Sequence, residues 1–300
     1  MSNSLVTVIA VCYNQHEYVE AALNSIISQT YKPIQLIVAD DGSTDGSKVV
    51  IQKWINDYNN DVIFVNNKTN LGLTKNINTA LPFVKGEFFQ VFGCDDIMLP
   101  QKIEQQVILL EQNKDAAIAY SDMFFINDKG EQLSQTYYEK HAYKKPSSGW
   151  LYHDLIERFI ISAPSVLIRK TVLDQLKKYN EHLDYEDQDF FLRASKNFHF
   201  IYSPEKTVSY RISANSLTGS STILKFMRNS FLIYLDNYDF NKEYQNKFDK
   251  KLIFYAKNLY AQKFKYAAQY FLNAFFKTHK IIFLKYTVAA LPFYFSGIKK

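Results

Sequence analysis

Short hydrophobic runs alternate with amphipathic stretches through the first hundred residues. Uncharged runs rich in β-branched residues predict four buried strands, at 5–11, 34–40, 61–67 and 87–93. Apolar residues at helical spacing predict intervening helices, at 17–29, 46–58 and 72–83. This alternation is typical of an α/β fold with a mostly parallel, doubly wound sheet flanked by helices, in which ligands bind at the carboxyl ends of the strands.

The pattern changes beyond the fourth strand. Pro100 opens an amphipathic helix that runs to about residue 112, and 116–122 reads as another strand. Residues 123–150 are polar and rich in Tyr and Lys, which predicts an irregular excursion. Short strands and one helix resume over 165–211, and from about residue 222 the pattern is helical throughout.

Charge separates the last part of the chain from the rest. Residues 1–220 carry 21 Lys and Arg against 26 Asp and Glu, whereas residues 221–300 carry 14 against four, within a whole-chain net charge of +5. The last part also holds 21 of the 46 Phe and Tyr residues. Such asymmetry suggests two bodies with different partners. We expect a domain at 1–221, with halves at 1–122 and 123–221, and a basic, aromatic-rich helical tail at 222–300.

Several classes of protein are excluded by composition. Two cysteines, Cys12 and Cys94, cannot build a disulfide framework or a four-cysteine zinc site. No Lys or Arg precedes Lys32, so the basic region of a signal peptide is missing, and no stretch offers about 20 apolar residues in a row. The six His show no metal-ligand spacing. We therefore expect a cytoplasmic protein.

Acidic residues gather where predicted strands end or a helix begins. Three adjacent pairs are found, at Asp40–Asp41, Asp95–Asp96 and Glu186–Asp187. A turn or helix cap is the common role of a single acid there, but adjacent carboxylates repel each other unless a cation or hydrogen-bond donors offset the charge. Pairs at the ends of neighbouring strands suit a divalent ion that holds substrate phosphates, and a lone carboxylate could take a proton from an attacking hydroxyl.

The motifs around these acids resemble those of the family 2 glycosyltransferases of GT-A fold. The matching segments, in order, are CYNQ, SIISQTY, IVADDGSTDGS, NLGLTKNINTAL, GEFFQVFGCDDIMLP, SAPSVLIRKTVL and YEDQDFFLRASK. Each motif alone is weak, but their shared order from residue 5 to about residue 215 makes a chance match improbable. The resemblance implies a Rossmann-like sheet and an inverting transferase of the bacterial surface-polysaccharide type. Its donor would be a nucleotide-diphosphate sugar, with a UDP-sugar expected, and its acceptor a hydroxyl of a glycan or lipid-linked molecule.

The resemblance also implies a donor site in the first half. Tyr13 would cover the nucleobase, or else be a structural aromatic at a strand end. Asp41 would accept the base N–H, with Asp40 beside it either taking this role or supporting the strand end. Lys75 stands where relatives often have an Arg near the phosphates, and a solvent-exposed helix lysine is the equal alternative.

A metal site is implied by the second acidic pair. Asp96 would contact Mg²⁺ or Mn²⁺ directly, and Asp95 would touch the ribose or a metal-bound water; both ions suit oxygen ligands. Many members of the family show Asp-x-Asp-Asp, whereas this chain has Gly93 in place of the leading acid. Cys94 reads as a small buried hydrophobe rather than a ligand.

The third pair resembles the catalytic base of the family. Asp187 would deprotonate the acceptor hydroxyl, and Glu186 could raise the pKa of Asp187 by repulsion. Asp189 reads as a helix-surface acid or a partner of Arg193 four residues on. Arg211 falls where relatives carry YR-x-His, with Ser213 at the position of the His; Arg211 either binds phosphate alone or forms a structural salt bridge.

The tail and the rival functions leave alternatives open. The tail reads either as a helical hairpin whose aromatics pack on the core, with Lys facing water, or as a peripheral contact with an anionic membrane. The apolar run at 286–298 is broken by Pro292 and flanked by Lys285 and Lys299–Lys300. Nothing resembles a nucleic-acid module. The rival functions are a non-catalytic sugar-nucleotide or glycan-binding protein on the same fold, and, ranked lowest, a nucleotidyltransferase.

Overall fold

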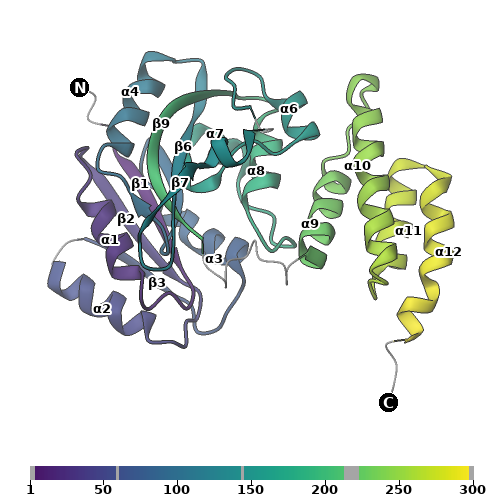
Figure 1. Ribbon diagram of the computed structural model, residues 1–300, viewed down its shortest axis with the longest axis horizontal. Helices are drawn as coiled ribbons and strands as arrows, with labels where there is room; N and C mark the ends of the chain where they lie inside the picture. Colours follow the sequence, from purple (N-terminus) through teal and green to yellow (C-terminus); the bar gives the residue numbers. More distant parts are fainter. Residues whose placement is uncertain (1–3, 59–60, 143–144, 213–222, 297–300) are drawn as a thin grey trace. The chain divides into compact units, whose positions relative to one another are not determined.

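The computed structural model describes residues 4–58, 61–142, 145–212 and 223–296 (Figure 1). The chain forms two compact units, Met1–Ser213 and Ala214–Lys300. The boundary that we expected at 221/222 lies outside the described residues. Within the described ranges, no helix combines the length and the apolar character that crossing a bilayer requires.

The first half of the first unit is a parallel sheet, as the alternating pattern predicted. Its strands are β1 (Val6–Cys12), β2 (Ile34–Asp40), β3 (Ile63–Asn66) and β4 (Phe88–Gly93), in the spatial order β3-β2-β1-β4. The connecting helices are α1 (Val19–Ile27), α2 (Ser47–Tyr58) and α3 (Leu73–Ala80), followed by the 3₁₀ turn η1 (Leu81–Phe83). All seven residues of β1 are buried, as expected of a central strand covered on both faces.

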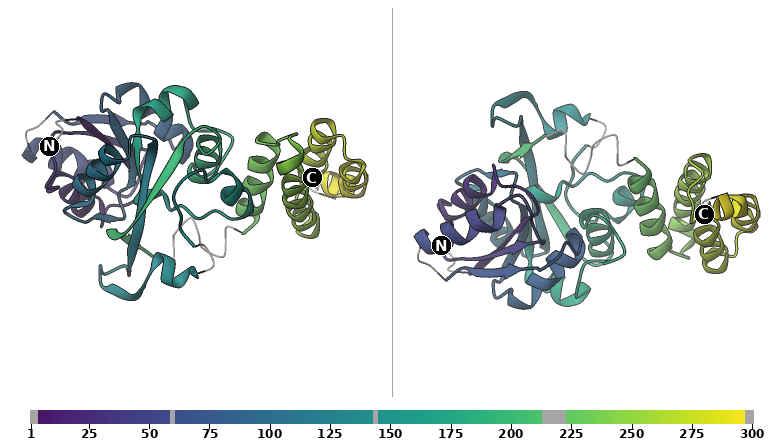
Figure 2. Two further views of the ribbon diagram at one scale, coloured as in Figure 1. Left: turned by 90° about the horizontal axis from the view of Figure 1, so that it is seen from above. Right: turned by 90° about the horizontal axis from the view of Figure 1, so that it is seen from below.

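The direction of the crossovers places the candidate site. Right-handed connections carry the chain from β1 to β2 and β3, and then back past β1 to β4, so α3 covers the opposite face of the sheet from α1 and α2 (Figures 1 and 2). β1 and β4 are therefore neighbours at a topological switch point, with Val11 paired to Gly93. Ligands of open α/β sheets bind at such a point, outside the carboxyl ends of the strands.

The second half continues the same sheet in the order β4-β8-β6-β9-β5, with β7 paired to β6. Its strands are β5 (Ile97–Met98), β6 (Ala116–Ile126), β7 (Gln132–Thr136), β8 (Leu167–Arg169) and β9 (His199–Arg211). Its helices are α4 (Lys102–Gln112), α5 (Tyr137–Lys140), α6 (Tyr152–Glu157), η3 (Ala163–Ser165), α7 (Lys170–Leu176) and α8 (Asp187–Ala194). β8 runs antiparallel to both β4 and β6, while β6 and β9 are parallel.

One expectation about this half was wrong. Residues 123–150 are not a plain irregular excursion, because β6 continues to Ile126 and the segment also contains β7 and α5. Strand pairing with β9 explains the continuation, since Phe125 pairs with Tyr210 and both Met123 and Phe125 are buried. The sequence hid this strand because its partner lies some 85 residues further along the chain.

The second unit is helical, as its pattern predicted. It consists of α9 (Ile223–Asp236), α10 (Lys242–Ala261), α11 (Ala267–Thr278) and α12 (Ile281–Ser296). Its core is aromatic: Phe231, Phe248, Phe271 and Phe283 are fully buried. The rings of Phe231 and Phe271 meet edge to face at 5.8 Å, a favourable geometry for aromatic pairs. Much of the aromatic content of the tail therefore serves its own packing.

Candidate active site

Two loops at the carboxyl ends of β1 and β2 are joined by hydrogen bonds. The backbone N–H of Asn14 donates to Ser43 Oγ at 2.9 Å, and the N–H of Thr44 donates back to Asn14 Oδ1 at 2.8 Å. The N–H of His16 donates to Asp45 at 2.9 Å. Asn14 has a left-handed φ of 52°, which its short polar side chain tolerates. These contacts fix the loop that carries Tyr13, whose side chain is 45% exposed and has a face open to a ligand.

Asp40 and Asp41 close β2 and are both buried. The carboxylate of Asp40 accepts hydrogen bonds from the backbone N–H and the hydroxyl of Ser43, and Lys48 Nζ lies 3.7 Å away. The carboxylate of Asp41 accepts the N–H groups of Leu71 at 2.8 Å and Gly72 at 2.9 Å. Both acids thus hold loops around the end of β2, and their contact with a nucleobase stays a prediction.

Gly42 allows these loops to approach each other. Its φ is +74°, and a Cβ at this position would stand 2.4 Å from the backbone carbon of Thr69. Only glycine fits such a left-handed, crowded position. The DDG motif is therefore explained by the backbone as well as by its carboxylates.

Helix α3 links this region to the loop before α8. Thr74 Oγ1 donates to the carbonyl of Leu183 at 3.0 Å, and Asn78 Nδ2 donates to the carbonyl of Tyr179 at 3.0 Å. Lys75 lies on the same helix and is exposed. The position of Lys75 is compatible with either of the roles that the sequence left open.

Asp95 and Asp96 directly follow β4. The carboxylate of Asp96 is 2% exposed and accepts the backbone N–H of Arg211 at 2.8 Å. Burial, and next the charge of Asp95, raise the pKa of Asp96 well above its usual range, although the N–H and the charge of Arg211 act in the opposite direction. Burial also raises the pKa of Asp95. A pair of crowded carboxylates with raised pKa values is a favourable place for a cation.

Gly93 stands at the position of the missing leading acid and lies close to both carboxylates. A Cβ at Gly93 would stand 2.7 Å from Asp95 Oδ1 and 3.8 Å from Asp96 Oδ2. Oxygens of both carboxylates therefore converge over this glycine. A side chain at Gly93 would require the end of the Asp95 side chain to shift.

The donor set of this site fits a divalent ion shared with substrate phosphates. Gln15 hydrogen-bonds Asp95 through its side chain, while its buried Oε1 has no partner among the described residues. That orphaned acceptor suits a ribose hydroxyl or a metal-bound water. No group of three or more His, Cys, Asp or Glu side chains in the described part is arranged to hold an ion by itself. One or two carboxylates are what Mg²⁺ takes from a protein when phosphates supply the remaining ligands.

Arg211 organises the acidic pair from the end of β9. Its Nε donates to the carbonyl of Asp95 at 2.8 Å, and its Nη1 donates to the carbonyls of Asn127 at 2.7 Å and Asp128 at 3.0 Å. The guanidinium also lies 4.3 Å from the centroid of the Tyr18 ring. These contacts give Arg211 a structural role, and a contact with phosphate stays a prediction. Ser213 lies outside the described residues.

Glu186 and Asp187 stand at the start of α8, at the edge of a narrow crevice. The crevice is lined by Val91, Ala163, Val166, Ile168, Tyr179, Glu186, Asp187 and Phe191. Burial among these side chains, and next the charge of Asp187, raise the pKa of Glu186 to about 8. Near neutral pH, Glu186 is thus largely protonated beside Asp187. A carboxylic acid next to a carboxylate can donate a hydrogen bond that a second carboxylate could not.

A fully buried lysine supports one wall of this crevice. Lys102 Nζ donates to Gln106 Oε1 at 2.6 Å, to the carbonyl of Val166 at 2.9 Å and to Gln90 Oε1. Burial lowers the pKa of Lys102 well below its usual range. The contact with Val166 fixes the segment after η3, which faces Asp187 across the crevice. The sequence offered no signal for this role, since Lys102 stands at the start of an ordinary amphipathic helix.

Asp189 does not lie on the helix surface. Its carboxylate is 2% exposed and accepts Arg193 Nε at 2.8 Å. The i,i+4 pairing that the sequence allowed is therefore confirmed, whereas the surface position is wrong. Arg193 also donates to the carbonyl of Lys178 at 3.0 Å, so the pair braces α8 against the preceding loop.

Tyr210 shows that the second and third acidic pairs share a neighbourhood. Burial raises the pKa of Tyr210, and the charges of Asp96, Asp95 and Asp187 each add to this effect. The charges of all three carboxylates are therefore near enough to Tyr210 to affect its pKa. Tyr210 is a site residue that sequence reasoning missed, as is Gln15 within the CYNQ motif.

The raised pKa of Glu186 has a consequence for stability. An acid whose pKa is about 4.3 in the unfolded chain and about 8 in the folded protein destabilises the fold increasingly as the pH rises between these values. We expect Glu186→Gln, which is neutral and of the same shape, to be more stable than the parent by about 1–2 kcal/mol at pH 9, a figure discounted for solvent screening. At pH 4 the two proteins should be equally stable.

Urea unfolding at both pH values measures this difference. The exposed Glu205→Gln serves as the matched control and should show no pH-dependent difference from the parent. A stability gain for Glu186→Gln that is as large at pH 4 as at pH 9 would contradict the protonated state of Glu186.

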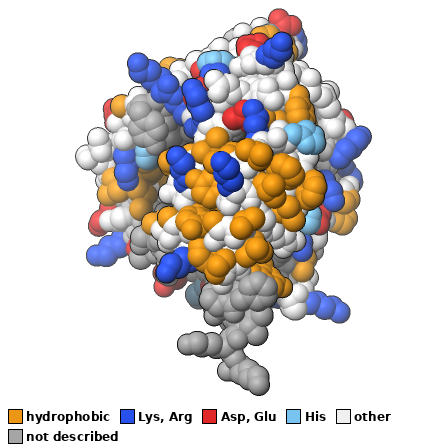
Figure 3. All heavy atoms as spheres, turned by 90° about the vertical axis from the view of Figure 1, so that its right-hand side faces the viewer, with side chains coloured by type: hydrophobic (Ala, Val, Ile, Leu, Met, Phe, Trp, Pro, Cys, Tyr) orange, Lys and Arg blue, Asp and Glu red, His pale blue; other side chains and the backbone are white. Residues whose placement is uncertain are grey.

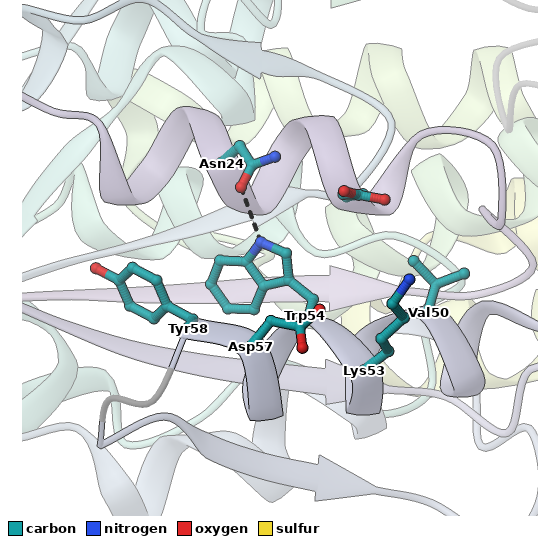
Figure 4. A pocket seen from close by; sticks show the side chains of 7 residues that line it. Asn24, Val50, Lys53, Trp54, Asp57 and Tyr58 are labelled. Atoms are coloured by element: carbon teal, nitrogen blue, oxygen red, sulfur yellow. Dashed lines mark hydrogen bonds between the residues drawn. The ribbon is translucent and has the colours of Figure 1, made fainter.

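A second hollow lies away from the acidic pairs. It has a volume of about 400 Å³ and is bordered by α1 and α2 (Figure 4). Trp54 and Tyr58 stack in it at 4.9 Å, and the indole N–H of Trp54 donates to Asn24 Oδ1 at 2.8 Å. None of the acids of the three pairs lines this hollow. We therefore place the candidate active site at the strand ends and not between these helices.

Comparison with known proteins shows the family of this chain. Residues 7–177 match the family described as glycosyl transferase family 2. An uncharacterized glycosyltransferase of Methanocaldococcus jannaschii is 28% identical over 214 residues, which cover 71% of this chain and 72% of that protein. An uncharacterized glycosyltransferase of Haemophilus influenzae is 29% identical over 247 residues, which cover 77% and 75%.

Solved structures share the fold. S. aureus TarS (1–349) in complex with UDP has a TM-score of 0.65 at 19% identity, covering 96% of this chain and 81% of that one. The mannosyltransferase of Pyrobaculum calidifontis in complex with GDP-Man and Mn²⁺ has a TM-score of 0.60 at 13% identity, covering 98% and 86%. The arrangement of helices around the sheet is thus the one found in glycosyltransferases of GT-A fold.

Proposed function

This chain belongs to glycosyl transferase family 2 and is a transferase, and from this premise we propose that it is an inverting, metal-dependent enzyme that moves a sugar from a nucleotide diphosphate to a hydroxyl group. One observation carries the proposal. The charges of the adjacent Asp95 and Asp96, and of Asp187 far along the chain from them, all help to raise the pKa of the buried Tyr210. Asp95 and Asp96 also follow β4 at the switch point, where α/β sheets bind their ligands.

The donor occupies the β1–β4 side of the site in this proposal. Tyr13 covers the nucleobase with its exposed face, and Asp41, supported by Asp40, meets the polar edge of the base. Lys75 and Arg211 stand nearest to the diphosphate. A UDP-sugar is the donor that we favour; a neighbour of the same fold was solved with UDP, and another with GDP-Man.

Asp96 would hold Mg²⁺ or Mn²⁺ directly, and Asp95, aided by Gln15, would hold a water of the ion or the ribose. The raised pKa of Asp96 supports this assignment, because a cation would relieve the repulsion from Asp95. When bound, such an ion supplies positive charge that stabilises the departing diphosphate. The backbone N–H of Arg211 keeps the carboxylate of Asp96 oriented.

Transfer is a single displacement at the sugar. Asp187 takes the proton of the acceptor hydroxyl, and the oxygen bonds to C1 from the side opposite the diphosphate. The bond between C1 and the phosphate oxygen breaks, its electron pair leaves with the diphosphate, and the configuration at C1 inverts. Glu186, protonated at neutral pH, stands beside Asp187 and can donate a hydrogen bond to it or to the acceptor.

The acceptor in this proposal is a glycan or a lipid-linked molecule, and the work is done at the inner face of a membrane. The basic second unit supports this location, since residues 221–300 carry a net charge of +10. Surface-polysaccharide synthesis is the process that such a donor and acceptor suggest.

The proposal is tested by donor turnover. The full chain is incubated with UDP- and GDP-sugars in Mn²⁺, with and without chelator, and the released nucleoside diphosphate is measured. Release that needs the ion supports the proposal. If the chain binds nucleotide but releases no nucleoside diphosphate under any condition, the non-catalytic sugar-nucleotide-binding alternative is favoured. If chelator does not change the release, the enzyme does not depend on a metal.

Tyr13 gives a separate test of the donor side. We expect Tyr13→Ala to weaken UDP binding by about tenfold, because stacking of a base on an aromatic ring contributes about 1–3 kcal/mol. Tyr13→Phe keeps the ring and should bind UDP as the parent does. Isothermal titration measures both, and equal affinity for Tyr13→Ala and the parent would place the base elsewhere.

A further inference from the structure

Helix α12 is largely apolar, with Lys285 as its only charged residue. Its inward side chains Phe283 and Ala290 are fully buried. Its outward side chains form a stripe at spacings of three and four residues, with exposed fractions between 36% and 66%: Ile281, Leu284, Val288, Leu291 and Tyr294. The apolar stripe of a surface helix normally faces the core. Here a second apolar stripe of α12 faces solvent.

The neighbouring helix α11 also has an exposed aromatic side chain. Phe276, near the end of α11, is 65% exposed and precedes the turn into α12. Figure 3 shows hydrophobic side chains gathered over this face of the second unit, with Lys and Arg among and around them. We call Phe276 and the outward stripe of α12 the α12 face. A contiguous apolar face on the surface of a protein marks a site of interaction.

The sequence that forms the α12 face is basic. Residues 250–300 contain ten Lys and no Asp or Glu. Lys285 is exposed on α12 next to the stripe, and Lys280 follows α11 in the turn. The last acid before this segment, Asp249, is paired with Lys280 at 2.8 Å. The partner of this face is therefore both apolar and negatively charged.

We propose that the α12 face lies on an anionic lipid bilayer, with α12 parallel to the membrane plane. Basic residues flanking an apolar stripe with Tyr and Phe are the features of an interfacial helix. The 16 residues of α12, with Lys285 and Pro292 among them, are too few and too polar to span. A second copy of the chain would bring its ten lysines against ten more, and nucleic acid would gain nothing from the apolar stripe.

Binding to the membrane would bring the proposed transferase to the surface that holds its acceptor. Only this purpose of the membrane contact rests on the proposed function. A lipid-linked acceptor would be confined to the same surface as the enzyme. Membrane binding itself depends only on the second unit and needs neither donor nor acceptor.

Co-sedimentation of the full chain with vesicles tests the proposal. The vesicles are phosphatidylcholine alone, or phosphatidylcholine mixed with phosphatidylglycerol at low and high salt. We expect binding to the anionic vesicles and its loss at high salt, because each lysine near a charged surface contributes separately. Equal binding to neutral vesicles, or no binding to anionic ones, would overturn the proposal.

Matched variants locate the face. Val288→Asp should weaken vesicle binding by at least about tenfold, since the charge would enter the apolar layer. Val49→Asp is the matched control, because Val49 lies on α2 and is 73% exposed, compared with 63% for Val288. This variant should bind vesicles as the parent does. Lys285→Gln should weaken binding by about fivefold. Vesicle binding by Val288→Asp equal to that of the parent would overturn the assignment of the face.

Two further measurements separate the rival explanations. Size-exclusion chromatography of Val288→Asp should match the parent, and a smaller species would show that the face joins two copies of the chain. UDP binding by the same variant should also match the parent. If Val288→Asp loses vesicle binding and keeps UDP binding, the α12 face contacts the membrane. If the parent binds vesicles but no nucleotide, the proposed function is wrong and the membrane proposal stands.

Discussion

Asp187→Asn should lower sugar transfer by about a thousandfold and leave donor binding unchanged. The asparagine has the size and the hydrogen-bonding oxygen of the aspartate, so Gln188 N–H, which now donates to Asp187 at 2.7 Å, keeps its acceptor. What is lost is the base that takes the acceptor proton, and such general bases contribute about 10²–10⁴ in rate. Product formation and UDP affinity, measured on one preparation, test both halves of this expectation.

Asp174→Asn is the matched control for Asp187→Asn. Asp174 lies on α7 with an exposed side chain, paired to Lys170 at 2.6 Å, and it does not line the crevice. Its replacement should leave transfer within about twofold of the parent, because an exposed ion pair contributes little. Transfer by Asp187→Asn at the rate of this control would remove Asp187 from the chemistry.

Asp96→Asn should abolish the effect of Mn²⁺ on donor binding. It should also lower turnover by about a thousandfold, as expected for Asp187→Asn. The amide keeps an oxygen for the N–H of Arg211 but carries no charge for the ion. The fold should not suffer, since burial already disfavours the charged form of Asp96. The expected thermal midpoint is therefore equal to or above that of the parent.

The measurement for Asp96→Asn is the affinity for UDP with Mn²⁺ and with chelator. The parent should bind UDP more tightly with the ion, and the variant should bind equally in both conditions. The carboxylate of Asp95 would contact the ion only through water. Asp95→Asn should therefore keep part of the difference in UDP affinity between Mn²⁺ and chelator. Full retention of the Mn²⁺ effect in Asp96→Asn would place the ion elsewhere.

The parallel strands of the sheet could be predicted because the residues of each strand are enough to indicate it. A run such as 5–11 has no charge and is flanked by amphipathic stretches, so its burial follows from its own residues. β6 was predicted four residues too short, since its last part is defined by pairing with β9. Long-range pairing of this kind leaves little mark in the pattern of one segment.

The sequence predicted which residues belong to the candidate site, but only part of how they are arranged. The acidic pairs were found from their positions after strands or at a helix start, and the charges of Asp95, Asp96 and Asp187 all affect the pKa of Tyr210. The sequence could not show that the pKa of Glu186 would rise to about 8, because the apolar wall comes from residues as distant as Val91. Nor could it show Arg211 holding Asp96 from the end of β9.

The central claim is that the donor sugar stands between Asp96 and Asp187. A crystal structure of Asp187→Asn grown with a UDP-sugar and Mn²⁺ tests it most directly, because the anomalous signal locates the ion independently of the protein. We expect the manganese peak at the carboxylate of Asp96, the uracil on Tyr13, and C1 of the sugar facing residue 187. A manganese peak or a nucleotide bound away from the ends of β1 and β4 would contradict the account.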